Sequence, residues 1–318
     1  MNILITGGCG YVGSLLTQQL LSDGHFITVV DIQWFGNPLE KHPNLKIIKC
    51  DIRQTDQIPL HECDAVVHLA NIANDPSVEL NPSLSWNVNV LATQQLAELS
   101  AMMGVKQFIY ASSGSVYGIK QDDEVTENLT LVPISVYNKT KMVAERVLLS
   151  YRDRMKIHCV RPATVCGWSP RMRLDLTINM LTLQAFKNGK ITVFGGEQTR
   201  PNINIKDMVR VYQHFLCNPS IPAGYYNAGF ENLSIFDIAK KIRDKLPAEI
   251  IITGSADPRS YRLNSDKLVS TGFKRLHGVD EAIDDMIIKL DTGIIQDTPQ
   301  SHTVEWMKTL NLHKDGNT

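Results

Sequence analysis

Short apolar segments alternate with longer amphipathic segments through the first half of the chain. The short segments are continuously apolar, as in strands that are buried on both faces of a sheet. We predict strands over residues 2–6, 26–31, 45–49, 65–69, 107–111 and 156–161, and helices over residues 11–23, 84–103 and 136–154. This alternation predicts an α/β fold, a doubly wound parallel sheet of the Rossmann type covered by helices on both faces.

The strand–helix rhythm breaks after about residue 165. Adjacent glycines and scattered prolines punctuate shorter segments there, at Gly195, Gly196, Pro201, Pro219, Pro222, Pro247 and Pro258. We therefore predict two parts, a sheet domain over residues 1–165 and a smaller C-terminal lobe over residues 166–318. The lobe should pack over the carboxyl edge of the sheet, and some of its segments should return to the sheet.

Composition and charge exclude several classes of protein. The 318 residues can bury a substantial core, and 43% hydrophobic with 20% charged residues is typical of a soluble globular protein. A formal net charge of -1 gives no reason to expect a nucleic acid or an acidic membrane as the partner. The first residues predict an apolar strand, so we expect no leader segment there, and no apolar stretch reaches membrane-spanning length. We expect a cytoplasmic enzyme.

The cysteines are scattered along the chain, at Cys9, Cys50, Cys63, Cys159, Cys166 and Cys217. They form no CxxC pair and no cluster with the spacing of metal ligands. We therefore expect reduced thiols and no metal site.

The first predicted strand runs into a glycine-rich turn, TGGCGYVG, over residues 6–13. The spacing of Gly7, Gly10 and Gly13 is that of a dinucleotide-binding turn, in which glycine allows a sharp bend, close approach of a pyrophosphate and tight helix–sheet packing. The helix starting at Tyr11 and Val12 would offer unpaired N–H groups and the positive end of its dipole to the phosphates. Because the turn lies between a strand and a helix, we interpret it as a binding site and not merely as a tight turn.

Carboxylates end or follow the next two strands. Asp31 lies 18 residues after Gly13, where it would accept hydrogen bonds from the adenosine ribose hydroxyls. It would also repel a 2′-phosphate, and Ile32 follows it where an arginine could otherwise hold that phosphate, so we predict NAD as the cofactor. Asp51 and Ile52 follow the third strand and are candidates for the adenine edge, although aspartate is also common in turns.

Tyr137 and Lys141 lie four residues apart on one face of the helix predicted over residues 136–154. Tyrosine, with a reference pKa of ~10, becomes a useful base only if its pKa falls by ~3 units, which requires roughly 4 kcal/mol. The ammonium of Lys141 and a positive nicotinamide ring could supply this energy, and Lys141 could also hydrogen-bond the nicotinamide ribose. The hydroxyl-rich segment 110–118 follows the fifth strand, at the sheet edge where ligands bind.

These motifs resemble the extended short-chain dehydrogenase/reductase family and, within it, the nucleotide-sugar epimerase/dehydratase branch. The resemblance covers nearly the whole chain and rests on the TGGCGYVG turn, Asp31, His68-Leu69-Ala70, SSGSVYG over residues 112–118, and the Tyr137/Lys141 pair. It implies that Ser113 is the catalytic hydroxyl, Tyr137 the acid/base and Lys141 its partner.

The resemblance also implies further cofactor contacts and a dimer. Leu69 and Ala70 would contact the cofactor, and Pro162 would border the nicotinamide. Asn89 matches a family asparagine, although Ala92 stands where the family usually has glycine. A homodimer would be built from the helices over residues 84–103 and 136–154.

For the substrate, the resemblance implies a nucleotide sugar held by its diphosphate. Arg200 matches the arginine of a family GxGxQxRDF segment, and Arg259 matches a second diphosphate arginine further along. Asn179 matches an asparagine near the same phosphates. The planar guanidinium suits this task because it binds phosphate oxygens in pairs. Arg171 and Arg173 form a further basic pair that either contacts substrate or faces solvent.

The residues leave more than one activity open. A dehydratase is disfavoured, because resembling dehydratases have Asp-Glu directly after the catalytic hydroxyl and this chain has Gly114 and Ser115. An epimerase and a dehydrogenase that releases the keto sugar both remain. A non-catalytic NAD-binding sensor is a third reading, which the presence of Ser113, Tyr137 and Lys141 disfavours.

Overall fold

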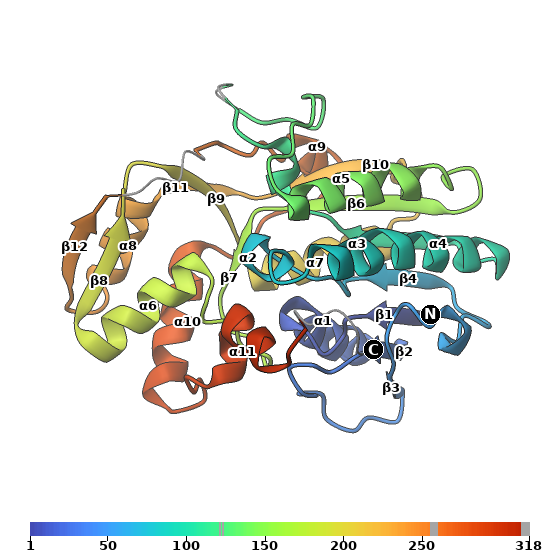
Figure 1. Cartoon of the computed structure of the whole chain (residues 1–318), viewed down its shortest axis with the longest axis horizontal. Coiled ribbons are helices and arrows are strands. Elements are labelled where there is room, and N and C mark those ends of the chain that lie inside the picture. Colours follow the sequence, from blue (N-terminus) through green and yellow to red (C-terminus); the bar gives the residue numbers. More distant parts are fainter. Residues whose placement is uncertain (121, 123, 255–259, 313–318) are drawn as a thin grey trace.

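Seven parallel strands form the centre of the molecule (Figure 1). The computed structural model describes residues 1–120, 122, 124–254 and 260–312. The strand order is β10-β6-β5-β4-β1-β2-β3, and every neighbouring pair is parallel. The strands are β1 (Asn2–Thr6), β2 (Phe26–Asp31), β3 (Leu45–Lys49), β4 (Ala65–His68), β5 (Gln107–Ala111), β6 (Lys156–Pro162) and β10 (Gly224–Ala228). The predicted α/β class is confirmed, and the six predicted strands are present.

Each face of the sheet has its own hydrophobic core. Ile3 and Ile5 of β1 point into one core with helices α1 (Tyr11–Ser22) and α7 (Ile205–Cys217). Leu4 points the opposite way, into a core with α4 (Thr93–Met102) and α5 (Val136–Leu149). Because successive side chains of a strand alternate between faces, a strand covered on both sides must be apolar throughout.

Two long helices differ from their predicted forms. The segment predicted over residues 84–103 is α3 (Pro82–Trp86), a π-helical turn η2 (Asn87–Ala92) and α4. The helix predicted to reach residue 154 ends at Leu149, and hydrogen-bonded turns follow, in which the Tyr151 N–H donates to Leu148. A π-helical turn adds a residue to the helix locally and is frequent at functional sites.

The second half of the chain contributes to the central sheet and also forms a separate lobe. β10 completes the sheet, and α7 packs on its face. The lobe has its own core of α6, α8 and α10 side chains around Cys166, Ile191 and Val193. Its elements are β7 (Thr164–Cys166), α6 (Thr177–Asn188), β8 (Lys190–Phe194), β9 (Thr199–Asn204), β11 (Glu231–Ser234), α8 (Ile235–Arg243), β12 (Glu249–Thr253) and α10 (Val279–Asp291). β7, β9 and β11 form one small sheet, and β8 and β12 pair in parallel.

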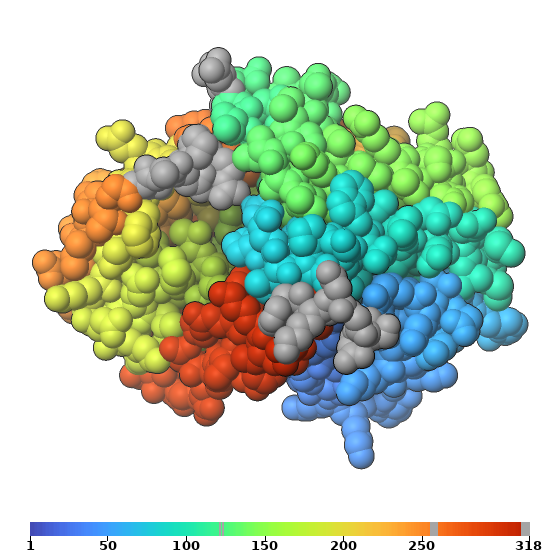
Figure 2. All heavy atoms as spheres, viewed as in Figure 1, coloured from blue at the N-terminus to red at the C-terminus, as the bar shows by residue number. Residues whose placement is uncertain are grey.

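The remaining elements are short. They are η1 (Thr55–Gln57), α2 (Asp75–Val78), η3 (Gly114–Tyr117), α9 (Asp266–Ser270), η4 (Pro299–Ser301) and α11 (Thr303–Thr309). Figure 2 shows the red C-terminal segment lying against the cyan segment that includes α2, and α11 contacts α2 directly. All six cysteines lie within the described residues and are free thiols. None of the helices in the described ranges is long and apolar enough to cross a membrane.

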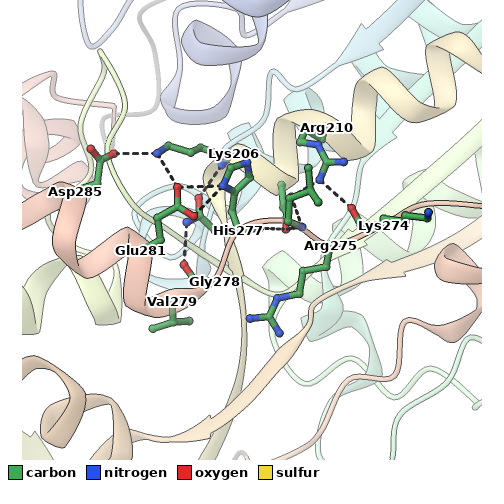
Figure 3. A network of polar contacts seen from close by, with 12 residues as sticks. Lys206, Arg210, Lys274, Arg275, His277, Gly278, Val279, Glu281 and Asp285 are labelled. Atoms are coloured by element: carbon green, nitrogen blue, oxygen red, sulfur yellow. Dashed lines mark hydrogen bonds and ion pairs between the residues drawn. The ribbon is translucent and has the colours of Figure 1, made fainter.

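A polar network ties α7 to α10 (Figure 3). Lys206 Nζ lies 3.0 Å from Glu281 Oε1 and 3.6 Å from Asp285 Oδ2. His277 Nδ1 lies 2.8 Å from Glu281 Oε2. The fully buried Asp207 accepts the N–H groups of Leu276 and His277. Exposed ion pairs contribute about 0–1 kcal/mol each. The buried carboxylate of Asp207 is therefore the main polar contact that holds the segment before α10 against α7.

Candidate functional site

A cavity of about 870 Å³ opens at the carboxyl ends of the central strands. Its wall includes one residue at or just beyond the end of each of six strands of the sheet: Gly7, Asp31, Asp51, Leu69, Ala111 and Pro162. The far wall comes from the C-terminal lobe, through residues such as Met180 and Ile235. Ligands of open α/β sheets bind at this edge.

The glycine turn fits a dinucleotide because side chains would block it. Gly7 has φ 73°, and a Cβ there would lie 2.6 Å from the backbone nitrogen of Ala70. A Cβ on Gly13 would lie 2.1 Å from the carbonyl oxygen of Gly7. Gly10, Tyr11, Val12 and Gly13 also line the cavity, so the amino end of α1 presents its N–H groups to it.

Asp31 is linked to the glycine turn by the backbone. Its carboxylate accepts the N–H of Cys9 at 2.9 Å and the N–H of Gln33 at 2.7 Å. Burial raises the pKa of Asp31, and these hydrogen bonds together with the nearby Arg171 oppose the rise. The carboxylate lines the cavity and is held in place, as recognition of a ribose requires.

Asp51 and Ile52 line the same end of the cavity. The Asp51 carboxylate is paired with Arg53, whose Nη2 lies 2.7 Å from Oδ2. Asp51 also accepts the Arg53 N–H at 2.9 Å, which is the hydrogen bond of a turn. The structure therefore gives Asp51 a local structural partner, and Ile52 supplies an apolar surface beside it.

Ser113 and Tyr137 face the cavity, and Lys141 lies behind them. The Ser113 hydroxyl lies 2.8 Å from the hydroxyl of Ser115, which donates to Asn138 Oδ1 at 2.6 Å. Lys141 is 2% exposed, and its Nζ donates to the carbonyl oxygen of Ala111 at 2.7 Å. The same Nζ lies 5.8 Å from the centroid of the Tyr137 ring. Burial lowers the pKa of Lys141 to about 7.

In the chain alone, the pKa of Tyr137 is not lowered. Burial raises the pKa of Tyr137 to about 12, and the Asp75 carboxylate adds to the rise. Ser113 and Arg173 act in the opposite direction but do not offset the desolvation. Lys141 is itself desolvated, and its ammonium donates to the carbonyl oxygen of Ala111. A phenolate at neutral pH therefore requires a further positive charge in the cavity.

A buried ion pair fixes the helix that carries Tyr137 and Lys141. Glu145 of α5 binds Arg161 of β6 in a bidentate pair, with oxygen–nitrogen distances of 2.8 and 2.7 Å. Arg161 Nη1 also donates to the Tyr117 hydroxyl at 2.8 Å. Glu145 lies one helical turn after Lys141, so its ion pair with Arg161 fixes the turn of α5 that follows Lys141.

Two asparagines expected at the ligands do not line the cavity. Asn89 is fully buried and uses its amide to bind both backbone groups of Ile72 and the Thr140 hydroxyl. Asn179 is also fully buried, and its amide binds the backbone of Gly167 and of Arg173 and the Tyr11 hydroxyl. Each asparagine thus orders a segment beside the cavity, and its contact with a ligand stays a prediction.

The two predicted substrate arginines have different outcomes. Arg200, on β9, lines the cavity from the lobe side. Arg259 lies outside the described residues. Gly114 and Ser115, where a dehydratase would have its acids, follow Ser113. Ser115 lines the cavity, and a Cβ on Gly114 would lie 3.1 Å from the carbonyl oxygen of Pro162. An acidic side chain at position 114 would therefore require the wall to move.

Three residues of the cavity wall were not predicted from the sequence. Asp75 lines the cavity near Tyr137 and accepts a hydrogen bond from Ser135. Thr303 and Met307 of α11 also line the cavity. Nearby, the Trp306 indole donates to the carbonyl oxygen of Trp34 at 2.6 Å. No local sequence motif marks them, because they reach the cavity only through the tertiary fold.

Comparison with known proteins agrees with this geometry. The model of the NAD dependent epimerase/dehydratase family matches residues 3–229. A UDP-glucose 4-epimerase of Lactobacillus helveticus is 28% identical over 90% of this chain and 95% of its own length. An uncharacterised UDP-glucose epimerase of Bacillus subtilis is 31% identical over 77% of this chain and 82% of its own length.

A solved structure resembles the whole chain. It is the UDP-glucuronic acid 4-epimerase of Bacillus cereus in complex with UDP-glucuronic acid and NAD. It has a TM-score of 0.80 and 26% identity, and the match covers 92% of this chain and 99% of that one.

Proposed function

The chain belongs to the NAD dependent epimerase/dehydratase family, and we propose that it epimerises a UDP-linked sugar at C4 through a keto-sugar intermediate. It is an enzyme of the extended short-chain dehydrogenase/reductase type, and its cofactor is NAD. The proposal takes the UDP group and the carbon from the relatives named UDP-glucose 4-epimerase and UDP-glucuronic acid 4-epimerase.

One observation carries the proposal. Ser113 and Tyr137 face the same cavity as Arg200, with Lys141 buried behind the tyrosine. The two positions after Ser113 hold no acid that could eliminate water. This set can move one proton at a sugar hydroxyl and hold a phosphate, and bound NAD would take and return the hydride that redox at a single carbon requires.

Tyr137 would take the proton of the sugar hydroxyl and later return it. Bound NAD supplies the hydride acceptor and a positive ring beside the tyrosine. Because burial raises the pKa of Tyr137 to about 12, the tyrosine in the chain alone holds its proton and cannot act as a base at neutral pH. Proton removal is thereby restricted to the complex with cofactor. Ser113 would orient the sugar hydroxyl toward Tyr137.

Epimerisation also requires the keto sugar to present its other face while its diphosphate stays bound. Arg200 is the described residue that we assign to the diphosphate, since it lines the cavity from β9, a strand of the C-terminal lobe. Arg259 stays a second candidate for the same phosphates. A guanidinium that grips phosphate leaves the sugar ring free to turn.

The proposal also includes a homodimer through the helical face of α3, η2, α4 and α5. On this side Leu91 is 55% exposed and Trp86 is 36% exposed. Light scattering of the purified chain distinguishes a monomer from a dimer, and a charged substitution such as Leu91→Glu should shift a dimer to monomer.

The direct test of the catalytic assignment is Tyr137→Phe. Turnover of UDP-sugars should fall by at least ~10²-fold, as is typical of losing a general acid/base, while bound NAD survives. The matched control is Tyr151→Phe, which removes a hydroxyl beyond the end of α5 and should keep full activity. A Tyr137→Phe enzyme with near-normal turnover would contradict the assignment.

A further inference from the structure

Arg171 lies in the cavity wall, and the proposed reaction assigns no role to it. It belongs to the segment between β7 and α6, which packs against the beginning of α1. The Ser169 hydroxyl donates to the carbonyl oxygen of Tyr11 at 2.5 Å, and the Tyr11 hydroxyl donates to the carbonyl oxygen of Gly167 at 2.7 Å. These contacts bring Arg171 to the same part of the wall as the glycine turn.

The guanidinium of Arg171 is buried and only partly satisfied. The residue is 7% exposed, and its Cζ lies 3.9 Å from the ring centroid of Phe35. Nη2 donates to the Thr303 hydroxyl at 3.3 Å. Nε is buried and has no hydrogen-bond partner among the described residues. Phe35 and Thr303 thus hold the group in position without neutralising it.

The neighbouring carboxylates do not pair with Arg171. Asp175 forms a two-point contact with Arg173, at 3.0 and 2.9 Å. Asp31 is close enough to interact electrostatically, but its hydrogen bonds come from Cys9 and Gln33. Burial and the nearby Arg173 lower the pKa of Arg171 to about 9. A buried charge without an ion pair is unfavourable, so the site favours a bound anion.

We propose that Arg171 binds the pyrophosphate of the dinucleotide, in addition to the N–H groups of the glycine turn. The covalent order of the cofactor supports this position, because the pyrophosphate is attached to the ribose that Asp31 is placed to bind and must continue toward the amino end of α1. The guanidinium lies within electrostatic reach of both Asp31 and Tyr11. Its planar N–H groups match phosphate oxygens better than a ribose hydroxyl. The inference rests on the NAD dependence of the chain and not on which sugar it converts.

The test compares two fragments of the cofactor that differ only in phosphate. The affinities of ADP and of adenosine are measured by calorimetry on the full chain freed of bound nucleotide. Arg171→Met should weaken ADP binding about ten- to hundredfold, the range for hydrogen bonds to charged groups, and should change adenosine affinity less than about twofold. Arg154→Met is the matched control: Arg154 is exposed, just before β6 at the opposite edge of the sheet, and the variant should leave both affinities unchanged.

Two further arms make the outcome decisive. Should Arg171→Met fail to fold, Arg171→Gln is judged by the same ratio of ADP to adenosine affinity. 2′,5′-ADP tests whether the arginine instead holds a 2′-phosphate. An unchanged ratio, an equal loss for ADP and adenosine, or a loss confined to 2′,5′-ADP would each overturn the proposal. None of these readouts depends on turnover, so they are independent of the epimerase assignment.

Discussion

Replacing Glu145 by glutamine should destabilise the protein strongly. The Glu145 side chain is 0% exposed and its partner Arg161 is 1% exposed, with an oxygen–nitrogen distance of 2.7 Å. Glutamine keeps the shape and one acceptor, but it leaves the guanidinium buried with only neutral partners, among them the Tyr117 hydroxyl. Breaking a buried pair in this way costs about 3–5 kcal/mol. Typical unfolding free energies are about 5–15 kcal/mol, so the loss would be a large fraction of the stability.

The assay is urea unfolding of the ligand-free protein at pH 7, followed by circular dichroism. Glu98→Gln is the matched control, because Glu98 is an exposed residue of α4 that accepts only from Gln94. That change should stay within about 0.5 kcal/mol. The double variant Glu145→Leu with Arg161→Met should recover most of the loss, since apolar replacement of both partners is often neutral. A Glu145→Gln loss below about 1 kcal/mol would refute the view that this pair anchors α5.

Three other changes test the site. Asp31→Ala should reduce the preference for NAD over NADP in binding titrations, and equal wild-type affinities for the two cofactors would contradict the assignment. Arg200→Ala should weaken UDP-sugar binding by roughly 1.5–3 kcal/mol with NAD affinity unchanged, whereas equal loss of both would place Arg200 at the cofactor. Burial lowers the pKa of Lys141 from 10.5 to about 7, so ligand-free wild type should be less stable than Lys141→Met at pH 7 and below. The difference in unfolding free energy between the two proteins should narrow as the pH rises toward about 10, because folded wild type then loses its buried charge while the unfolded chain is still protonated. A difference that does not change with pH would contradict this.

The central sheet could be predicted because its signals are local. Each buried strand is continuously apolar, and the glycine turn lies at a fixed place between β1 and α1. Gly7 and Gly13 could be selected from sequence because their role is steric: a side chain at either one would collide with backbone. Asp31 was predictable for a similar reason, since its place at the end of β2 follows from the strand itself.

The rest of the site depends on segments that are distant in sequence. Arg171 and Thr303 are 132 positions apart, and nothing in either segment predicts their contact. Asn89 and Asn179 match family positions, yet their amides are taken up by the backbone of neighbouring segments, which only the tertiary fold determines. The spacing of Tyr137 and Lys141 shows a lysine one turn away from the tyrosine, but it does not show that both groups are buried.

The central claim is reversible hydride transfer at one sugar carbon with retained NAD, and the sharpest test is conversion in D₂O. Purified wild-type enzyme, without added NAD, is incubated with UDP-glucose and separately with UDP-glucuronic acid, and proton NMR follows the products. We predict a C4 epimer of unchanged mass that keeps protium at C4, with no NADH released to solution. Deuterium at the epimerised carbon, or a keto sugar formed together with an equal amount of NADH, would contradict it.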